Sequence, residues 1–166
     1  MEKAKRVPSI INAKVLSLVV LAAAIFVSSY LSYLKFDYTA SPMCVQGGMF
    51  DCGTVLNSSY SEIANIPIAY LGLATNLLVV ALLLLENRTS FLREWSAIFV
   101  FGVVFFATLF SVYLIYIQAF RIEAFCPWCL THEALIFILF GLSVYRLVRH
   151  LNAPLETELD SELQPQ

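Results

Sequence analysis

Four long apolar runs dominate this 166-residue sequence and constrain what it can fold into. They cover residues 13–34, 66–85, 95–118 and 129–148. A helix needs roughly 20 apolar residues to cross a hydrocarbon core about 30 Å thick, and each run meets that length. Because backbone groups in lipid must find their hydrogen bonds within the segment, the runs predict an all-α bundle of four transmembrane helices.

The composition supports a location in membrane lipid. Hydrophobic residues make up 60% of the chain and charged residues 13%, whereas soluble domains have about 45–50% and about 25%. The first run is too long for the apolar region of a signal peptide and no clear cleavage site follows it, so we expect it to stay as a helix. The net charge of −2 gives no basic surface for nucleic acid.

The four runs cannot be divided into independent cores, so residues 1–150 are predicted to form one transmembrane domain. Residues 151–166 follow as a tail that lacks aromatic residues and carries Glu156, Glu158, Asp160 and Glu162. This composition is typical of a solvated, disordered segment.

The lysines and arginines predict how the bundle is oriented, because cytoplasmic loops are enriched in them. Lys35 and Arg121 follow the first and third runs. The other eight lie at the opposite helix ends: Lys3, Lys5, Arg6, Lys14, Arg88, Arg93, Arg146 and Arg149. We therefore expect a multi-pass protein of the cell membrane with both termini in the cytoplasm and with residues 35–65 and 119–125 outside.

All four cysteines fall on the predicted outer side, in two pairs. Cys44 and Cys52 share the long loop, and Cys126 and Cys129 form a Cys-Pro-Trp-Cys motif where the fourth run begins. Disulfides form and persist in that compartment. Because a thiolate attacks a disulfide sulfur through a mixed disulfide, two neighbouring pairs can pass electrons to each other.

The two pairs differ in their predicted surroundings. The positive end of a helix lowers the pKa of a nearby thiol, which favours a nucleophilic Cys126 or Cys129. Cys129 lies about one turn deeper and is better placed to meet a lipid-soluble oxidant. Cys44 and Cys52 lie on either side of two glycines and are predicted to form a mobile carrier pair. An inert structural staple and a four-cysteine zinc site are the alternatives, although only one pair has the close spacing of a zinc knuckle.

A quinone is the natural acceptor for these electrons, since the sequence contains no flavin, haem or nucleotide motif. An apolar pocket with a few hydrogen-bond donors suffices to bind it. The third run is rich in aromatic residues that can line such a pocket or simply pack: Phe101, Phe105, Phe106, Phe110, Tyr113 and Tyr116.

His132 and Glu133 follow the Cys-Pro-Trp-Cys motif in a stretch predicted to enter the bilayer. Ionisable residues there are rare and usually functional. Glu133 is four residues after Cys129 and shares its helix face, where it can relay a proton or bond a quinone oxygen. The alternative is that both side chains reach interfacial water.

Part of the long loop is predicted to form a short amphipathic helix over residues 54–64, lying across the mouth of the bundle as a lid. Ser58-Ser59-Tyr60-Ser61-Glu62 resembles a capping box that leads into Ile63 and Ala64. Pro67 and Pro127 mark the starts of the second and fourth long helices.

Several motifs follow a fixed order between residues 13 and 149. They are Cys44 and Cys52 with seven residues between them, Ser58 six residues later, Pro67, Gly72, and Cys126-Pro127-Trp128-Cys129. In this combination the chain resembles the vitamin K epoxide reductases and their microbial homologues.

The resemblance implies a four-helix bundle around a quinone of the ubiquinone, menaquinone or vitamin K type. It assigns the reaction with the quinone to Cys129, the resolving role to Cys126, and the shuttle to Cys52 with Cys44. Electrons would then run from a substrate protein through the shuttle pair to the second pair and the quinone.

The resemblance also extends to three further positions. Ser58 matches the family's loop serine or threonine, and Asn65 corresponds to an asparagine that bonds the quinone in the animal enzymes. Glu133 stands where the animal enzymes have a quinone-bonding tyrosine. Many microbial members carry a fused thioredoxin-like domain, and its absence here implies a separate thioredoxin-like partner outside the cytoplasm.

The sequence thus predicts a membrane oxidoreductase that makes disulfides in a thioredoxin-like protein and reduces a quinone. Reduction of vitamin K quinone or epoxide by the same cysteines is one alternative. A four-span protein with structural disulfides and no enzymatic activity is the other.

Overall fold

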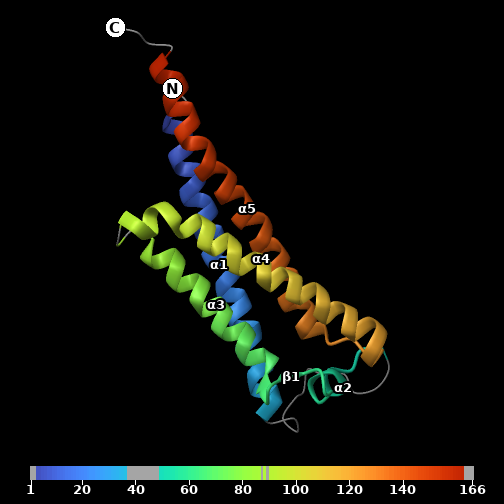
Figure 1. Ribbon diagram of the computed structural model, residues 1–166. Helices are drawn as coiled ribbons and strands as arrows, with labels where there is room; N and C mark the ends of the chain where they lie inside the picture. The colour runs from blue at the N-terminus through green and yellow to red at the C-terminus, as the bar shows by residue number, and fades with distance from the viewer. Residues whose placement is uncertain (1–2, 37–48, 87, 89, 163–166) are drawn as a thin grey trace.

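The computed structural model describes residues 3–36, 49–86, 88 and 90–162. Its long helices are α1 (Lys3–Phe36), α3 (Ile68–Leu85), α4 (Ser90–Ile117) and α5 (Pro127–Glu162) (Figure 1). Four segments are long and apolar enough to cross a membrane: Asn12–Lys35, Ile68–Leu85, Trp95–Ile122 and Pro127–Asn152. The predicted all-α bundle of four membrane-spanning helices is confirmed.

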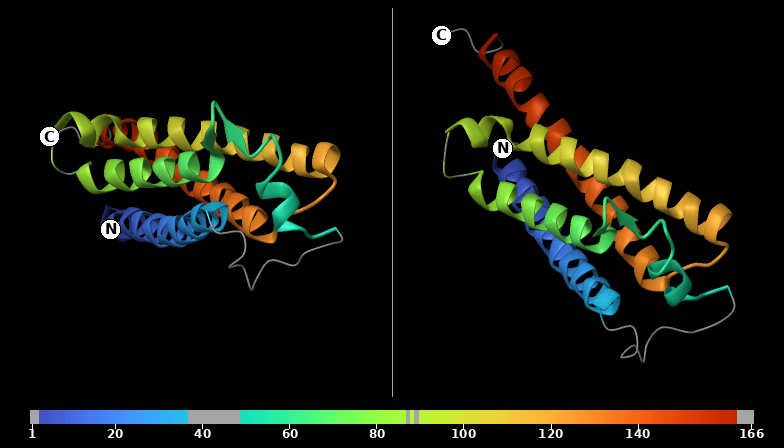
Figure 2. Two further views of the ribbon diagram at one scale, coloured as in Figure 1. Left: turned by 90° about the horizontal axis from the view of Figure 1, so that it is seen from below. Right: turned by 60° about the horizontal axis from the view of Figure 1, so that its bottom comes forward.

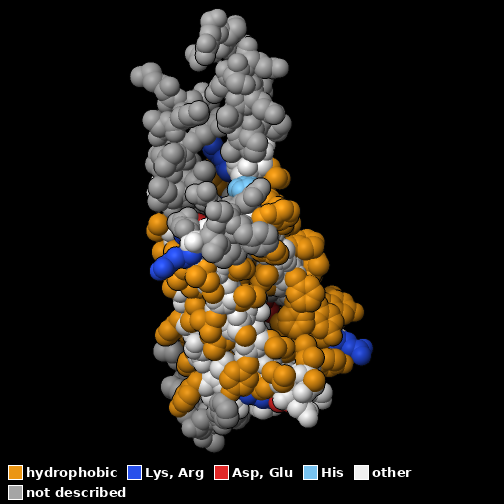
Figure 3. Space-filling view, turned by 60° about the vertical axis from the view of Figure 1, so that its left-hand side comes forward, with side chains coloured by type: hydrophobic (Ala, Val, Ile, Leu, Met, Phe, Trp, Pro, Cys, Tyr) orange, Lys and Arg blue, Asp and Glu red, His pale blue; other side chains and the backbone are white. Residues whose placement is uncertain are grey.

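The four long helices pack as a ring in which α1 contacts α3 and α5, and α4 contacts the same two helices (Figure 2). Large apolar side chains point away from this ring, and Phe26 and Leu84 are 67% and 58% exposed. On the face drawn in Figure 3, apolar side chains cover the middle of the bundle. Such a surface is suited to lipid, since a soluble protein rarely exposes a large continuous apolar patch.

Two clusters of buried apolar side chains hold the bundle together. The first, which includes Leu21, Leu83 and Val104, joins α1, α3 and α4 and also contains a residue of α5. The second includes Leu31 of α1 and Leu56 of the loop, together with Cys52 and Cys126. The loop is therefore packed onto the bundle by the same apolar cluster that buries the two thiols.

The described part of the loop, residues 49–67, forms a compact cap over one end of the bundle. It contains the short helix α2 (Cys52–Leu56) and a hairpin of β1 (Glu62–Ile63) and β2 (Ile66–Pro67), with Ile63 opposite Ile66. This cap lies at the opposite end of the bundle from the start of α1 and the end of α5 (Figure 1).

The loop contains a short helix, as predicted, but the predicted bounds, residues 54–64, are wrong. Asp51 caps α2 by accepting the backbone N–H groups of Gly53 and Thr54, so the helix begins earlier and ends at Leu56. Ala64 and Asn65 then both adopt positive φ angles, 52° and 64°. A two-residue turn of this kind matches the twist of a hairpin, so the chain reverses where the capping-box pattern predicted a helix.

The prolines fall close to the predicted helix starts. Pro127 is the first residue of α5, and Pro67 caps α3 from the end of β2. At its other end α5 continues to Glu162, so residues 151–162 are helical where the sequence predicted a disordered tail. The division into a transmembrane domain and a tail stays a prediction.

Charged side chains cluster at the end of the bundle opposite the cap. Glu86 lies 2.7 Å from Lys14 and 2.7 Å from Arg146, which connects α1, the end of α3 and α5. Lys14 and Arg146 belong to the group predicted to face the cytoplasm. This end of the bundle is thus separate from the end that carries the described cysteines. The side of the membrane that each end faces stays a prediction.

Candidate functional site

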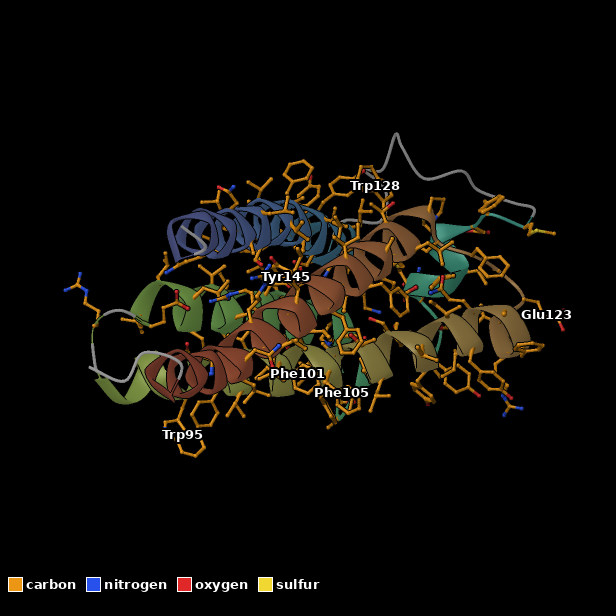
Figure 4. The ribbon with its side chains drawn as sticks, turned by 90° about the horizontal axis from the view of Figure 1, so that it is seen from above. Trp95, Phe101, Phe105, Glu123, Trp128 and Tyr145 are labelled. Atoms are coloured by element: carbon orange, nitrogen blue, oxygen red, sulfur yellow. The ribbon has the colours of Figure 1, made fainter. Side chains whose placement is uncertain are left out.

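Cys126 and Cys129 lie where α5 begins. The Leu130 N–H donates to the Cys126 carbonyl at 2.9 Å, which forms the first turn, and the Cys129 N–H donates to Cys126 Sγ at 3.3 Å. Cys126 has no exposed surface, and both residues are free thiols. The side chain between them is also fixed, since the Trp128 ring lies 4.7 Å from that of Tyr30 on α1 (Figure 4).

The third described thiol, Cys52, is brought to Cys126 by pairing between two distant chain segments. Phe50 and Phe125 form a parallel bridge, and the Phe125 N–H donates to the Met49 carbonyl at 2.9 Å. The bridge lies directly before both cysteines, and Cys52 reaches hydrogen-bonding distance of Cys126. Cys44 lies outside the described residues.

Cys126 has the electrostatic environment of a nucleophile. Its pKa is lowered to about 7, chiefly by the hydrogen bond from the Cys129 thiol, and burial opposes this shift. The backbone N–H groups of Cys129 and Trp128 and the Cys52 thiol lower it further. Because these donors stabilise the thiolate, an appreciable fraction of Cys126 is charged at neutral pH.

A cavity of about 760 Å³ lies between the four long helices and the cap. Its wall is mostly apolar and includes Phe106 and Phe110 of α4. Cys129 also lines it, whereas Cys126 and Cys52 do not. The three described thiols therefore form a row, with Cys52 in the cap, Cys126 in the middle and Cys129 at the cavity.

A chain of polar groups connects Cys126 with this cavity. The Cys126 N–H donates to Gln118 Oε1 at 3.0 Å, and Gln118 Nε2 donates to Glu133 Oε1 at 3.3 Å. Gln118 and Glu133 are each 3% exposed, and both line the cavity. Gln118 opens the π-helical turn η2 (Gln118–Ile122), an irregularity that is frequent at functional sites.

A second polar group lines the cavity between α1, α3 and α5. Asn76 Nδ2 lies 3.0 Å from His132 Nε2 and 3.4 Å from Ser28 Oγ. Asn76 and Ser28 are each 1% exposed. Gly72 lies next to the His132 ring, where an added Cβ would be 3.6 Å away. The cavity therefore offers these two groups of polar partners at separate places in a mostly apolar wall.

The other predicted site residues differ in their placement. Ser58 lines the cavity, and its hydroxyl donates to the Val55 carbonyl at 2.8 Å. Asn65 is exposed in the hairpin turn and does not line the cavity. Asparagine tolerates the positive φ that this turn requires, which accounts for the residue without a ligand. Phe101 and Phe105 pack against Phe140 of α5 (Figure 4).

Lys35, at the end of α1, fastens the cap to the bundle. Its Nζ donates to the Leu56 carbonyl at 2.7 Å and to Ser61 Oγ at 3.1 Å, and it lies 3.0 Å from Glu62 Oε1. These contacts reach both α2 and the hairpin, so one side chain holds the segment that carries Cys52.

The fold and the site together define a multi-pass membrane protein that carries a row of thiols beside an apolar cavity. The chain belongs to the vitamin K epoxide reductase family, whose profile matches residues 15–144. It is similar to the thiol-disulfide oxidoreductase LTO1 of Arabidopsis thaliana, with 31% identity over 122 residues. The matched region covers 70% of this chain and 32% of that protein, so the chain spans about a third of the relative's length.

Gln118 and Asn76 were not predicted from the sequence. Each is a polar residue within an apolar run, as His132 and Glu133 are, and that interruption was the available signal. Uncharged amides are common enough at helix interfaces in membranes that the signal alone does not single them out.

Proposed function

We propose that this protein is a membrane thiol oxidoreductase that makes disulfides in a partner protein and passes the electrons to a membrane quinone. One observation carries the proposal: Cys129 lines the apolar cavity while Cys126 contacts both Cys129 and Cys52. A row of thiols with one end at an apolar cavity suits transfer from a protein to a lipid-soluble acceptor.

The cavity suits a quinone in size and chemistry. Its volume of about 760 Å³ lies within the roughly 300–1,000 Å³ of small-molecule sites. A bound quinone accepts two electrons and two protons. Ser58, Glu133 and the Asn76–His132 pair are the groups that we propose for hydrogen bonds to it. Asn65 lies away from the wall, and its part in binding is supported only by the family resemblance.

Electron transfer proceeds by disulfide exchange between the two pairs. The partner's dithiol reduces the Cys44–Cys52 disulfide and becomes a disulfide itself. The shuttle thiols then reduce the Cys126–Cys129 disulfide through a bond between Cys52 and Cys126, which contact each other. The Cys126–Cys129 dithiol loses two electrons and two protons to the quinone, which returns the site to its starting state.

The partner that fits this role is a thioredoxin-like protein, outside the cytoplasm if the predicted orientation is correct. Replacing Cys52 with Ser leaves Cys44 without its resolving thiol, so a mixed disulfide with the partner should accumulate. Non-reducing electrophoresis and mass spectrometry of the purified Cys52→Ser protein would identify the partner and the joined cysteine. A Cys44→Ser, Cys52→Ser double variant is the matched control and should trap nothing.

The acceptor can be tested with purified protein and a reduced thioredoxin-like protein. We expect turnover with ubiquinone or menaquinone and little with menadione epoxide, because Glu133 replaces the tyrosine of the animal enzymes. Faster turnover with the epoxide would instead indicate a vitamin K epoxide reductase. Disulfides that resist mild reductant and no reoxidation by any quinone would indicate a structural protein.

A further inference from the structure

Glu133 is a buried carboxyl group whose environment is unusual for a charged residue. It is 3% exposed and lines the cavity one helical turn after Cys129. Oε1 accepts a hydrogen bond from Gln118, and Oε2 has no hydrogen-bond partner among the described residues. Among the described residues, no lysine or arginine forms a salt bridge with Glu133.

Gln118 fixes the way in which this carboxyl group is held. The Cys126 backbone N–H can only donate, so the Gln118 carbonyl must face Cys126 and its NH₂ group must face Glu133. Both ends of the amide are thereby engaged. Oε1 of Glu133 is held as an acceptor, and Oε2 is buried without a hydrogen-bond partner among the described residues.

Among the described residues no lysine or arginine pairs with Glu133, and this bears on its protonation. An ionised carboxylate in an apolar cavity is costly without a cation, and a neutral carboxyl group avoids that cost. With a proton on Oε2, the group becomes a hydrogen-bond donor in the wall of the cavity that Cys129 also lines.

We propose that Glu133 is a catalytic residue that transfers a proton during oxidation of the Cys126–Cys129 dithiol, and that Gln118 is its positioning residue. This inference rests on the proposed function. The dithiol loses two electrons and two protons as the Cys126–Cys129 bond forms, and a 1,4-quinone gains both and becomes the quinol. Glu133 gives its proton to one quinone oxygen and recovers a proton from Cys129. The proton of Cys126 is released to water at the cap, and water supplies the proton that the other quinone oxygen takes up.

The rate test uses the full-length protein in lipid nanodiscs. Reduced protein is mixed with a soluble ubiquinone analogue, and formation of the Cys126–Cys129 disulfide is followed in a single turnover. Glu133→Gln should slow this step about 100-fold or more at saturating quinone, since general acid catalysis contributes roughly 10²–10⁴-fold. The half-saturating quinone concentration should change little. Gln118→Met should cause a smaller loss, because it frees the carboxyl group without removing it.

Two further variants separate catalysis from structure. Glu133→Asp keeps a carboxyl group and should react faster than Glu133→Gln. Thr131→Ala is the matched control on α5, because Thr131 is exposed and its hydroxyl donates to the Pro127 carbonyl of the same helix. Reduction of the Cys126–Cys129 disulfide by dithiothreitol without quinone should proceed at the wild-type rate in Glu133→Gln, Glu133→Asp and Thr131→Ala.

A spectroscopic readout needs no quinone. The infrared spectrum of the wild-type protein at neutral pH should contain the carbonyl band of a protonated carboxyl group, and Glu133→Gln should lack it. Absence of that band in the wild type, or equal rates for the Asp and Gln variants, would overturn the inference while leaving quinone reduction intact. Failure of the wild-type protein to react with any quinone would instead overturn the proposed function.

Discussion

At the scale of single residues, the site depends on the difference between two cysteines three positions apart. Cys126 receives hydrogen bonds from Cys129 and Cys52, whereas Cys129 faces the cavity. The stabilised thiolate, that of Cys126, is thus the one that both of the other described thiols can reach. This arrangement suits a central residue that exchanges disulfides in either direction.

The pKa of Cys126 gives a residue-scale prediction. Because the pKa is lowered to about 7, the reduced protein should gain one thiolate as the pH rises through about 7, and Cys126 should be protonated below it. Replacing Cys129 with Ala removes the main hydrogen-bond donor and should move this titration upward, toward the ordinary value of 9.0. Ultraviolet thiolate absorbance of the reduced protein, in a Cys44→Ser background, measures both titrations. An unchanged midpoint in Cys129→Ala would show that another group stabilises the thiolate.

The sequence was informative about residues whose chemistry is rare in a membrane. Cysteines at a helix start and an ionisable Glu133 stand out in any apolar run, and Cys126, Cys129 and Glu133 indeed lie together. Gln118 acts through a contact between η2 and the start of α5, which depends on how two helix ends meet. Its role was therefore not predictable from spacing.

At the scale of elements, the cap decides whether Cys52 meets Cys126. The Phe50–Phe125 bridge aligns the two segments, and Lys35 fastens α2 and the hairpin to α1. The long helices were predictable because a run of apolar residues specifies a spanning helix almost by itself. The cap was not, since a five-residue helix and two short strands depend on these distant contacts.

Loss of the Lys35 contacts should loosen the cap and slow the exchange between the two cysteine pairs more than the quinone step, although Lys35 also lines the cavity. We expect Lys35→Met to slow reduction of the Cys126–Cys129 disulfide by the Cys44–Cys52 dithiol by about 3- to 10-fold, because it removes three modest polar contacts of the cap. Rapid acid quenching and thiol labelling would follow the exchange. Glu62→Gln is the milder control, because it changes only one of the three contacts. Equal slowing of oxidation by quinone in Lys35→Met would contradict a role confined to the cap.

At the scale of the whole molecule, the two ends of the bundle have different tasks. The end with the cap carries the described thiols and the cavity, and the other carries the Lys14–Glu86–Arg146 cluster. Carboxyl and basic side chains there are only 9–21% exposed, so the cluster ties three helices together near a low-dielectric region.

Replacing Glu86 should therefore destabilise the bundle as a whole. Glu86→Ala leaves two cations facing each other, and we expect a loss of about 2 kcal/mol, between the values for exposed and buried ion pairs. The melting temperature of the detergent-solubilised protein measures the effect. Glu123→Gln, an exposed site at the opposite end, is the control (Figure 4). An unchanged melting temperature in Glu86→Ala would show that the cluster contributes nothing to stability.

The central claim is that electrons leave the thiol row through Cys129 into the cavity. The most direct measurement is the stoichiometry of quinol formed when fully reduced protein in nanodiscs is mixed with excess quinone without a partner protein. The wild type should form two quinols per protein and both disulfides, because the Cys44–Cys52 dithiol is oxidised through the Cys126–Cys129 pair. Cys52→Ala should still form one quinol per protein, and Cys129→Ala should form none. Quinol formation by Cys129→Ala at the wild-type rate would contradict the account.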